Sequence, residues 1–80
     1  MTMDWREHIE RKPGVMGGRP VIKGTRITVE LLLEWLAAGW SEEEILRNYP
    51  RMTVEDLRAV HAFAREIIAE GFYTLEPRAA

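Results

Sequence analysis

Three hydroxyl residues divide the second part of the chain. Thr28, Ser41 and Thr53 each stand directly before a segment with helical apolar periodicity. At such a position the hydroxyl oxygen can accept a hydrogen bond from an early amide of the helix. The segments close at residues that end helices, namely Gly39, Pro50 and Gly71. This punctuation predicts three consecutive helices after Thr28 and constrains the fold more than any other feature.

The first of these segments predicts a helix over about residues 29–38. Glu30 and Glu34 form its polar edge, and its apolar residues cover more than one face: Leu31, Leu32, Leu33, Trp35 and Leu36. Gly39 occupies the position of a left-handed residue that closes a helix. Trp40 is therefore expected to pack back on Trp35.

Capping boxes are expected at the start of the other two helices. In S-E-E-E, from Ser41 to Glu44, the Glu44 carboxylate can reach back to the cap residue, and the helix that follows should bury Ile45, Leu46 and Tyr49. In T-V-E-D, from Thr53 to Asp56, aspartate takes the fourth position of the box and is a weaker substitute for glutamate. The third helix, about 54–70, should turn one set of side chains inward, with Phe63 at the border: Leu57, Val60, Ala64, Ile67 and Ile68.

Residues 1–27 contain glycines and prolines between short β-compatible runs, from His8 to Arg11 and from Arg19 to Lys23. Gly24-Thr25 fits a turn or bulge in which glycine adopts a positive φ. The glycines lack the spacing of a phosphate-binding loop, and Gly17-Gly18 precede the first helix by about ten residues. A short β-hairpin is therefore favoured over a nucleotide site.

These elements together predict a mainly α protein: a three-helix, helix-turn-helix-like domain preceded by a short N-terminal β-hairpin. The 80 residues are enough for one domain, with a basic hairpin arm at 1–27, a three-helix bundle at 28–71 and a short tail at 72–80. A chain of this size buries only about 60% of the surface that its unfolded form exposes. It therefore gains stability from a partner.

Charge is unevenly distributed along the chain. Residues 1–27 hold six basic and three acidic side chains, whereas residues 28–80 hold five basic and ten acidic ones. A polyanion or an acidic partner should therefore meet the first part, through Arg19, Lys23 and Arg26. Arg51 and Arg58 lie at the start of the third helix and are the supporting candidates, although Glu55 and Asp56 there have the wrong sign for phosphate.

The remaining residues indicate no catalytic or metal chemistry. The chain has no cysteine, and neither His8 nor His61 has a ligand residue three or four positions later. No serine–histidine pair suggests a nucleophile, so neither an enzyme nor a small-molecule site nor a cofactor is expected. No apolar run approaches the roughly 20 residues needed to span a bilayer, and a cytoplasmic protein is expected.

Several long motifs resemble the family catalogued as domain of unknown function 433. They are P-G-V-M-G-G-R-P-V-I-K-G-T-R-I-T-V, L-L-E-W-L-A-A-G-W-S-E-E-E-I-L and N-Y-P-R-M-T-V-E-D-L-R-A-V. The resemblance covers about residues 9–68 and implies a homeodomain-like, helix-turn-helix-like fold. It further implies a likeness to VapB-type antitoxins, which are often paired with a PIN-like ribonuclease toxin. The implied partners are that toxin and operator DNA.

The apolar surplus of the first helix predicts a homodimer. The hairpins and the first helix are expected to supply the interface, through Ile9, Val21, Ile22, Leu31 and Trp35. An antitoxin-like binding protein is the leading hypothesis for the function. The alternative is a dimeric protein–protein adaptor that does not bind DNA.

Overall fold

Each predicted cap residue begins a helix in the computed structural model, which describes residues 3–71. The helices are α1 (Val29–Ala37), α2 (Glu42–Asn48) and α3 (Val54–Ala69). The hydroxyl oxygens of Thr28, Ser41 and Thr53 accept hydrogen bonds of 3.0, 3.0 and 3.1 Å from the amides three residues later. The prediction of three helices is confirmed, with ends within a residue or two of those expected.

The end of α1 confirms the predicted closure. Gly39 has a φ of +101°, and the Trp40 amide donates a 3.1 Å hydrogen bond to the Trp35 carbonyl oxygen. The two indole rings stack with centroids 5.8 Å apart. On its other side Trp35 stacks against Tyr49, whose ring centroid is 4.9 Å away.

Residues 3–27, called the leader below, form the predicted hairpin, and the chain then reverses direction a second time. Strands β1 (Ile9–Glu10) and β2 (Val21–Ile22) are antiparallel, with Ile9 opposite Ile22. The chain then turns at Gly24, whose φ is +77°, and the Thr25 amide donates to the Ile22 carbonyl oxygen over 3.0 Å. Gly24 therefore supplies the positive φ expected of it. Two short turns, Trp5–Glu7 and Met16–Gly18, were not expected from the sequence.

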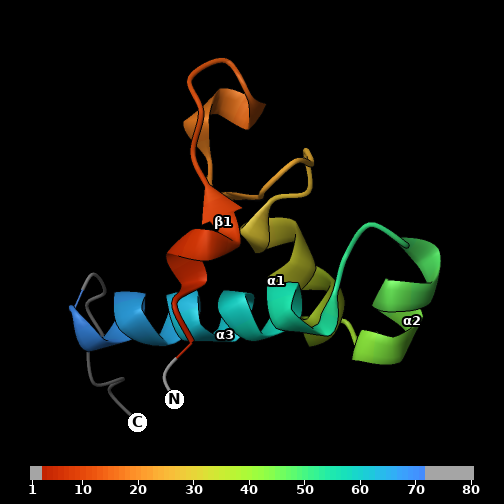
Figure 1. The fold of residues 1–80 in the computed structure, drawn as a ribbon. Coiled ribbons are helices and arrows are strands. Elements are labelled where there is room, and N and C mark those ends of the chain that lie inside the picture. The colour runs from red at the N-terminus through yellow and green to blue at the C-terminus, as the bar shows by residue number, and fades with distance from the viewer. Residues whose placement is uncertain (1–2, 72–80) are drawn as a thin grey trace, which may run out of the picture.

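Helix α3 is the centre of the arrangement. It contacts α1, α2, β1 and the turn at Trp5–Glu7. Figure 1 shows the hairpin standing on one side of α3, with α2 beside the N-terminal end of that helix. The buried apolar side chains come from all three helices, the hairpin and the loop before α3: Ile9, Val21, Ile22, Val29, Leu32, Ile45, Met52, Leu57, Ala59 and Val60.

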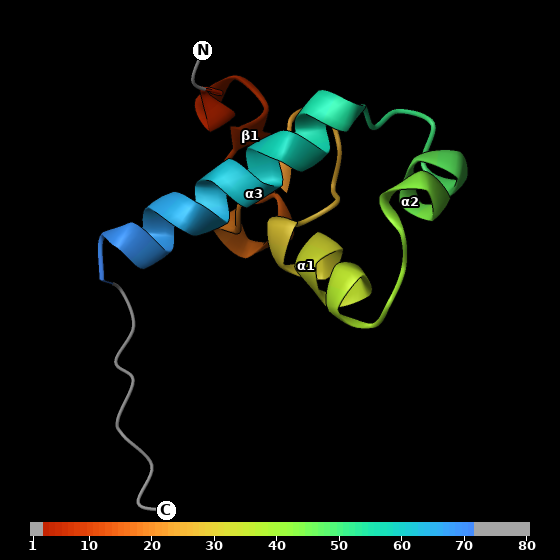
Figure 2. The ribbon, with the colours of Figure 1, turned by 90° about the horizontal axis from the view of Figure 1, so that it is seen from below.

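Two predictions about apolar residues need correction. Ile68 was expected to face inward but is 58% exposed. Figure 2 shows why: the last turns of α3 extend beyond α1, so that helix does not cover them. Ile9, Val21 and Ile22 were expected at a dimer interface, yet they are only 4%, 1% and 2% exposed in the single chain. Packing within the single chain therefore buries these three side chains without a second copy.

The other expected positions are intermediate. Leu31 and Trp35, the remaining interface candidates, are half-buried. Ala64, Ile67, Leu46 and Tyr49 are half-buried as well. Within residues 3–71 no helix is both long and apolar enough to cross a bilayer. The predicted tail at 72–80 lies outside the described residues.

Candidate functional site

A basic hollow lies where the Gly24 turn meets the loop before α3. The Arg51 guanidinium donates a 3.4 Å hydrogen bond from Nη1 to the Gly24 carbonyl oxygen, which joins the two segments. The hollow has a volume of about 360 Å³. Its lining consists of Glu10, Lys12, Val15, Gly24, Thr25, Arg26 and Arg51.

Cations outnumber carboxylates in this basic hollow. Lys12, Arg26 and Arg51 contribute three positive charges, and Glu10 is the one acid in the lining. The Glu10 carboxylate is already engaged, because Oε2 lies 3.4 Å from the Gly24 amide nitrogen and 3.6 Å from Lys12 Nζ. The three cationic side chains are exposed. The lining therefore suits an anion, because charged donors form strong hydrogen bonds to groups such as phosphate.

The five predicted contact residues do not all lie together. Arg26 and Arg51 line the basic hollow, and Lys23 is the exposed residue just before Gly24. Arg19 lies elsewhere, with Nη1 3.0 Å from Glu30 Oε1. Arg58 is exposed on α3 and is not part of the lining.

Lys12 belongs to the basic hollow but was not selected from the sequence. It stands two residues after Glu10, so in an extended segment both side chains lie on one side of the backbone. That spacing was a usable signal. The spacing indicates a shared site only in the folded chain, where the Gly24 turn lies beside Glu10.

The start of α3 is less acidic at its surface than the sequence suggested. Asp56 turns inward: Oδ1 lies 2.9 Å from His8 Nδ1, and Oδ2 accepts a 3.0 Å hydrogen bond from the Thr53 amide. Its side chain is only 13% exposed. Glu55 remains exposed, so one of the two carboxylates expected to oppose phosphate is directed away from the surface.

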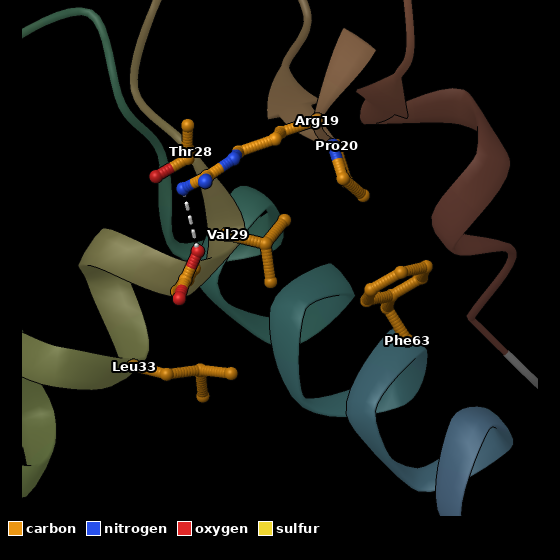
Figure 3. Close-up of a pocket in the computed structure, with 7 residues that line it drawn as sticks. Arg19, Pro20, Thr28, Val29, Leu33 and Phe63 are labelled. Carbon is orange, nitrogen blue, oxygen red and sulfur yellow. Dashed lines mark hydrogen bonds and ion pairs between the residues drawn. The ribbon is translucent and has the colours of Figure 1, made fainter. Parts of the chain in front are cut away.

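A second hollow, the apolar hollow, lies between the start of α1 and the middle of α3. Its volume is about 470 Å³, and it is lined by Arg19, Pro20, Thr28, Val29, Glu30, Leu33 and Phe63. Figure 3 shows the side chains of Val29, Leu33 and Phe63 pointing toward a common gap. Arg19 and Glu30, which also line the hollow, form an ion pair of 3.0 Å. The sequence pattern predicted Phe63 at the border of α3 but gave no indication of this hollow.

Phe63 and Pro20 also wall a smaller neighbouring hollow of about 230 Å³, together with Trp5 and Ile9. The Trp5 and Phe63 rings meet edge to face with centroids 4.8 Å apart. Apolar surface therefore continues around Phe63 from α1 to the leader.

The two histidines each face one carboxylate. His61 Nε2 lies 3.3 Å from Glu42 Oε2 at an exposed position, in addition to the His8–Asp56 pair. Among residues 3–71, no group of three or more histidine, aspartate or glutamate side chains is arranged to hold a metal ion.

The sequence also matches a family model. Residues 9–64 match proteins of unknown function described as DUF433. The chain belongs to the DUF433 family. The matched stretch contains every residue that lines the basic hollow and every residue that lines the apolar hollow.

Two relatives extend this assignment. A crystal structure of a DUF433 member from Anabaena variabilis has a TM-score of 0.72 and 37% identity to this chain, covering 78% of this chain and 61% of that one. The uncharacterised protein y4eO of Sinorhizobium fredii is 36% identical over 59 residues, which are 74% of this chain and 27% of that protein. The chain thus spans about a quarter of the curated relative that it matches.

Proposed function

We propose that this family member is an antitoxin-like binding protein of the cytoplasm. It binds operator DNA through the basic hollow and the start of α3, and it neutralises a PIN-like ribonuclease toxin. In this proposal α2, residues 49–53 and α3 form a helix-turn-helix, and the protein acts by binding, not by catalysis.

The observation that carries the DNA-binding part is the convergence of Arg26 and Arg51. These residues are distant in sequence, yet both line one hollow beside the N-terminal end of α3. Phosphate contacts fix the position of a protein on a duplex, and a recognition helix presents its first turn to base edges. Cations held beside that first turn are placed for such a backbone contact.

The exposed side chains of the first turns of α3 support this assignment. Val54 is 44% exposed, and Arg58 is exposed one turn later. An apolar side chain can contact a thymine methyl group, and an arginine can donate two hydrogen bonds to guanine. The inward-turned Asp56 leaves this surface closer to the charge that DNA requires.

The toxin part of the proposal rests on the likeness of the family to VapB-type antitoxins. The expected partner is a PIN-like ribonuclease, encoded in a neighbouring reading frame. Co-expression should yield a complex in which purified toxin loses its ribonuclease activity. A toxin that stays fully active with excess protein present would contradict this part alone.

The alternative is an adaptor that binds a protein and not DNA. The exposed glutamates at the start of α2, Glu42, Glu43 and Glu44, favour it, because they form an acidic surface suited to a basic partner. A DNA-binding measurement distinguishes the two proposals, because only the leading one predicts binding.

A mobility-shift titration on the upstream region of the gene tests the leading proposal. Replacing both Arg26 and Arg51 with alanine should weaken binding and reduce the slope of log affinity against log salt by about two, since each lost phosphate contact removes about one. Arg6→Ala is the control, because Arg6 pairs with Glu66 over 3.1 Å toward the other end of α3 and is not in the lining of the basic hollow, so it should leave affinity and slope nearly unchanged. Equal affinity and slope for the double variant and the parent would overturn the assignment of the basic hollow.

A further inference from the structure

The apolar side of α3 continues past the end of the core. Leu57 and Val60 are buried on the first half of the helix. Ala64, Ile67 and Ile68 continue the same three- and four-residue spacing on the second half. There Ala64 and Ile67 are half-buried and Ile68 is 58% exposed. An apolar arc of just over one turn, from Ala64 to Ile68, therefore lies partly open to solvent.

The apolar hollow adjoins this arc. Phe63, in its wall, is the neighbour of Ala64 and stands one turn before Ile67 on α3. Leu33, on the α1 wall, is 37% exposed. One side of the molecule thus presents a recess and, farther along the same helix, a projecting isoleucine.

We propose that this side binds a second copy of the chain, with Ile68 of each copy seated in the apolar hollow of the other. A twofold arrangement makes the same contact twice and closes, as in most homodimers. It covers the apolar arc of both copies at once. The inference does not depend on DNA or toxin binding.

The charges beside the two apolar elements are complementary. Helix α1 carries Glu30 and Glu34 and contains no basic residue. Arg65 stands three residues before Ile68, so the two are neighbours on the surface of α3. Glu30 is already paired with Arg19 over 3.0 Å, which leaves Glu34 as the α1 carboxylate for a second copy. Placing the α3 end of one copy on the α1 wall of the other therefore brings Arg65 toward Glu34, and the twofold repeats this contact. That self-complementarity favours a second copy over an unrelated partner.

This interface differs from the one expected from the sequence. Ile9, Val21 and Ile22 are already buried in the chain and have little surface to offer. The proposed interface uses Leu33, Phe63 and Ile68 in their place.

Sedimentation equilibrium at tens of micromolar tests the proposal. The parent should have twice the chain mass of 9.3 kDa. Ile68→Glu and Leu33→Glu should each raise the dissociation constant about tenfold or more, because each places a carboxylate in an apolar contact. Val54→Glu is the matched control: it makes the same kind of change at a 44% exposed site on α3, away from the interface, and should leave the dimer intact.

A crosslink tests which residues meet. The chain contains no cysteine, so a mixture of Leu33→Cys and Ile68→Cys proteins has one thiol per chain. Oxidation should join the two variants far more efficiently than a mixture of Val54→Cys and Ile68→Cys. A monomeric parent, a dimer that both glutamate variants keep, or equal crosslinking in the two mixtures would each overturn the proposal. Thermal unfolding of each variant confirms that it is folded.

Discussion

The Nδ1 atom of His8 lies 2.9 Å from the Oδ1 atom of Asp56. This contact joins the leader, just before β1, to the third residue of α3. The other Asp56 oxygen accepts the Thr53 amide, so a single carboxylate both caps α3 and holds the hairpin against it. The cap of the central helix and the docking of the basic hairpin are thereby coupled.

Removing this pair should show that coupling. In a double-mutant cycle of His8→Ala and Asp56→Ala, we expect an interaction term of about 1 kcal/mol in the free energy of unfolding. Asp56→Ala alone should cost about 2 kcal/mol, because it also removes half of the capping box. Urea denaturation measures each value.

The His61–Glu42 pair is the control for this cycle. It joins the same chemical groups over 3.3 Å, but its side chains are 57% and 50% exposed. Solvent screens such pairs, so its interaction term should be too small to resolve. Equal terms for the two cycles would mean that burial does not strengthen the His8–Asp56 contact.

The two capping boxes should differ in strength, in the opposite order to that expected from the sequence. At Thr53 both reciprocal hydrogen bonds form, whereas at Ser41 the Glu44 carboxylate meets the serine hydroxyl over 3.2 Å and not the backbone amide. Thr53→Ala should therefore lower the free energy of unfolding by about 1–2 kcal/mol, and Ser41→Ala by about 0.5 kcal/mol. Urea denaturation with equal m values compares them, and a larger loss at Ser41 would refute this ranking.

The features that the sequence predicted correctly depend on neighbouring residues. A helix cap involves residues three apart, and the Gly24 turn involves four consecutive residues. Thr28, Ser41, Thr53 and Gly24 could therefore be interpreted without knowing the fold. The Trp35–Trp40 stack was also predictable, since the closing glycine sets its geometry.

The features that the sequence did not predict depend on how distant segments dock. Lys12 joins Arg26 and Arg51 only because the Gly24 turn lies against the loop before α3. Helical periodicity placed Ile68 on the apolar side of α3, but it contains no information on where α1 stops covering that side. Capping depends on the spacing of residues close in sequence, while exposure depends on which distant segments pack beside the helix.

The aromatic stack at the end of α1 should contribute to stability. Trp35 lies between Trp40 and Tyr49, with interplanar angles of 24° and 16°. Trp40→Ala removes one of these partners and should lower the free energy of unfolding by about 1–2 kcal/mol. Trp40→Phe should retain most of this contribution to the free energy of unfolding. Near-ultraviolet circular dichroism reports loss of the stack, and an unchanged spectrum and midpoint in the alanine variant would contradict the prediction.

Met16 has a left-handed backbone that should be relieved by substitution. Its φ is +48°, and Gly17 and Gly18 follow with φ values of +67° and +78°. A left-handed conformation costs an ordinary residue about 1–2 kcal/mol, whereas asparagine tolerates it. Met16 is 46% exposed, so the apolar burial lost with its side chain offsets only part of this relief. Met16→Asn should therefore raise the free energy of unfolding by about 0.5–1 kcal/mol in urea denaturation.

Val15→Asn separates this backbone effect from the effect of adding a polar side chain to the loop. Val15 is the preceding residue and has an extended φ of −109°, so asparagine relieves nothing there. The gain should appear at Met16 and be absent at Val15. If both substitutions stabilise equally, surface polarity is responsible and not the left-handed backbone. If Met16→Asn destabilises, contacts of the methionine side chain outweigh the relief of its backbone.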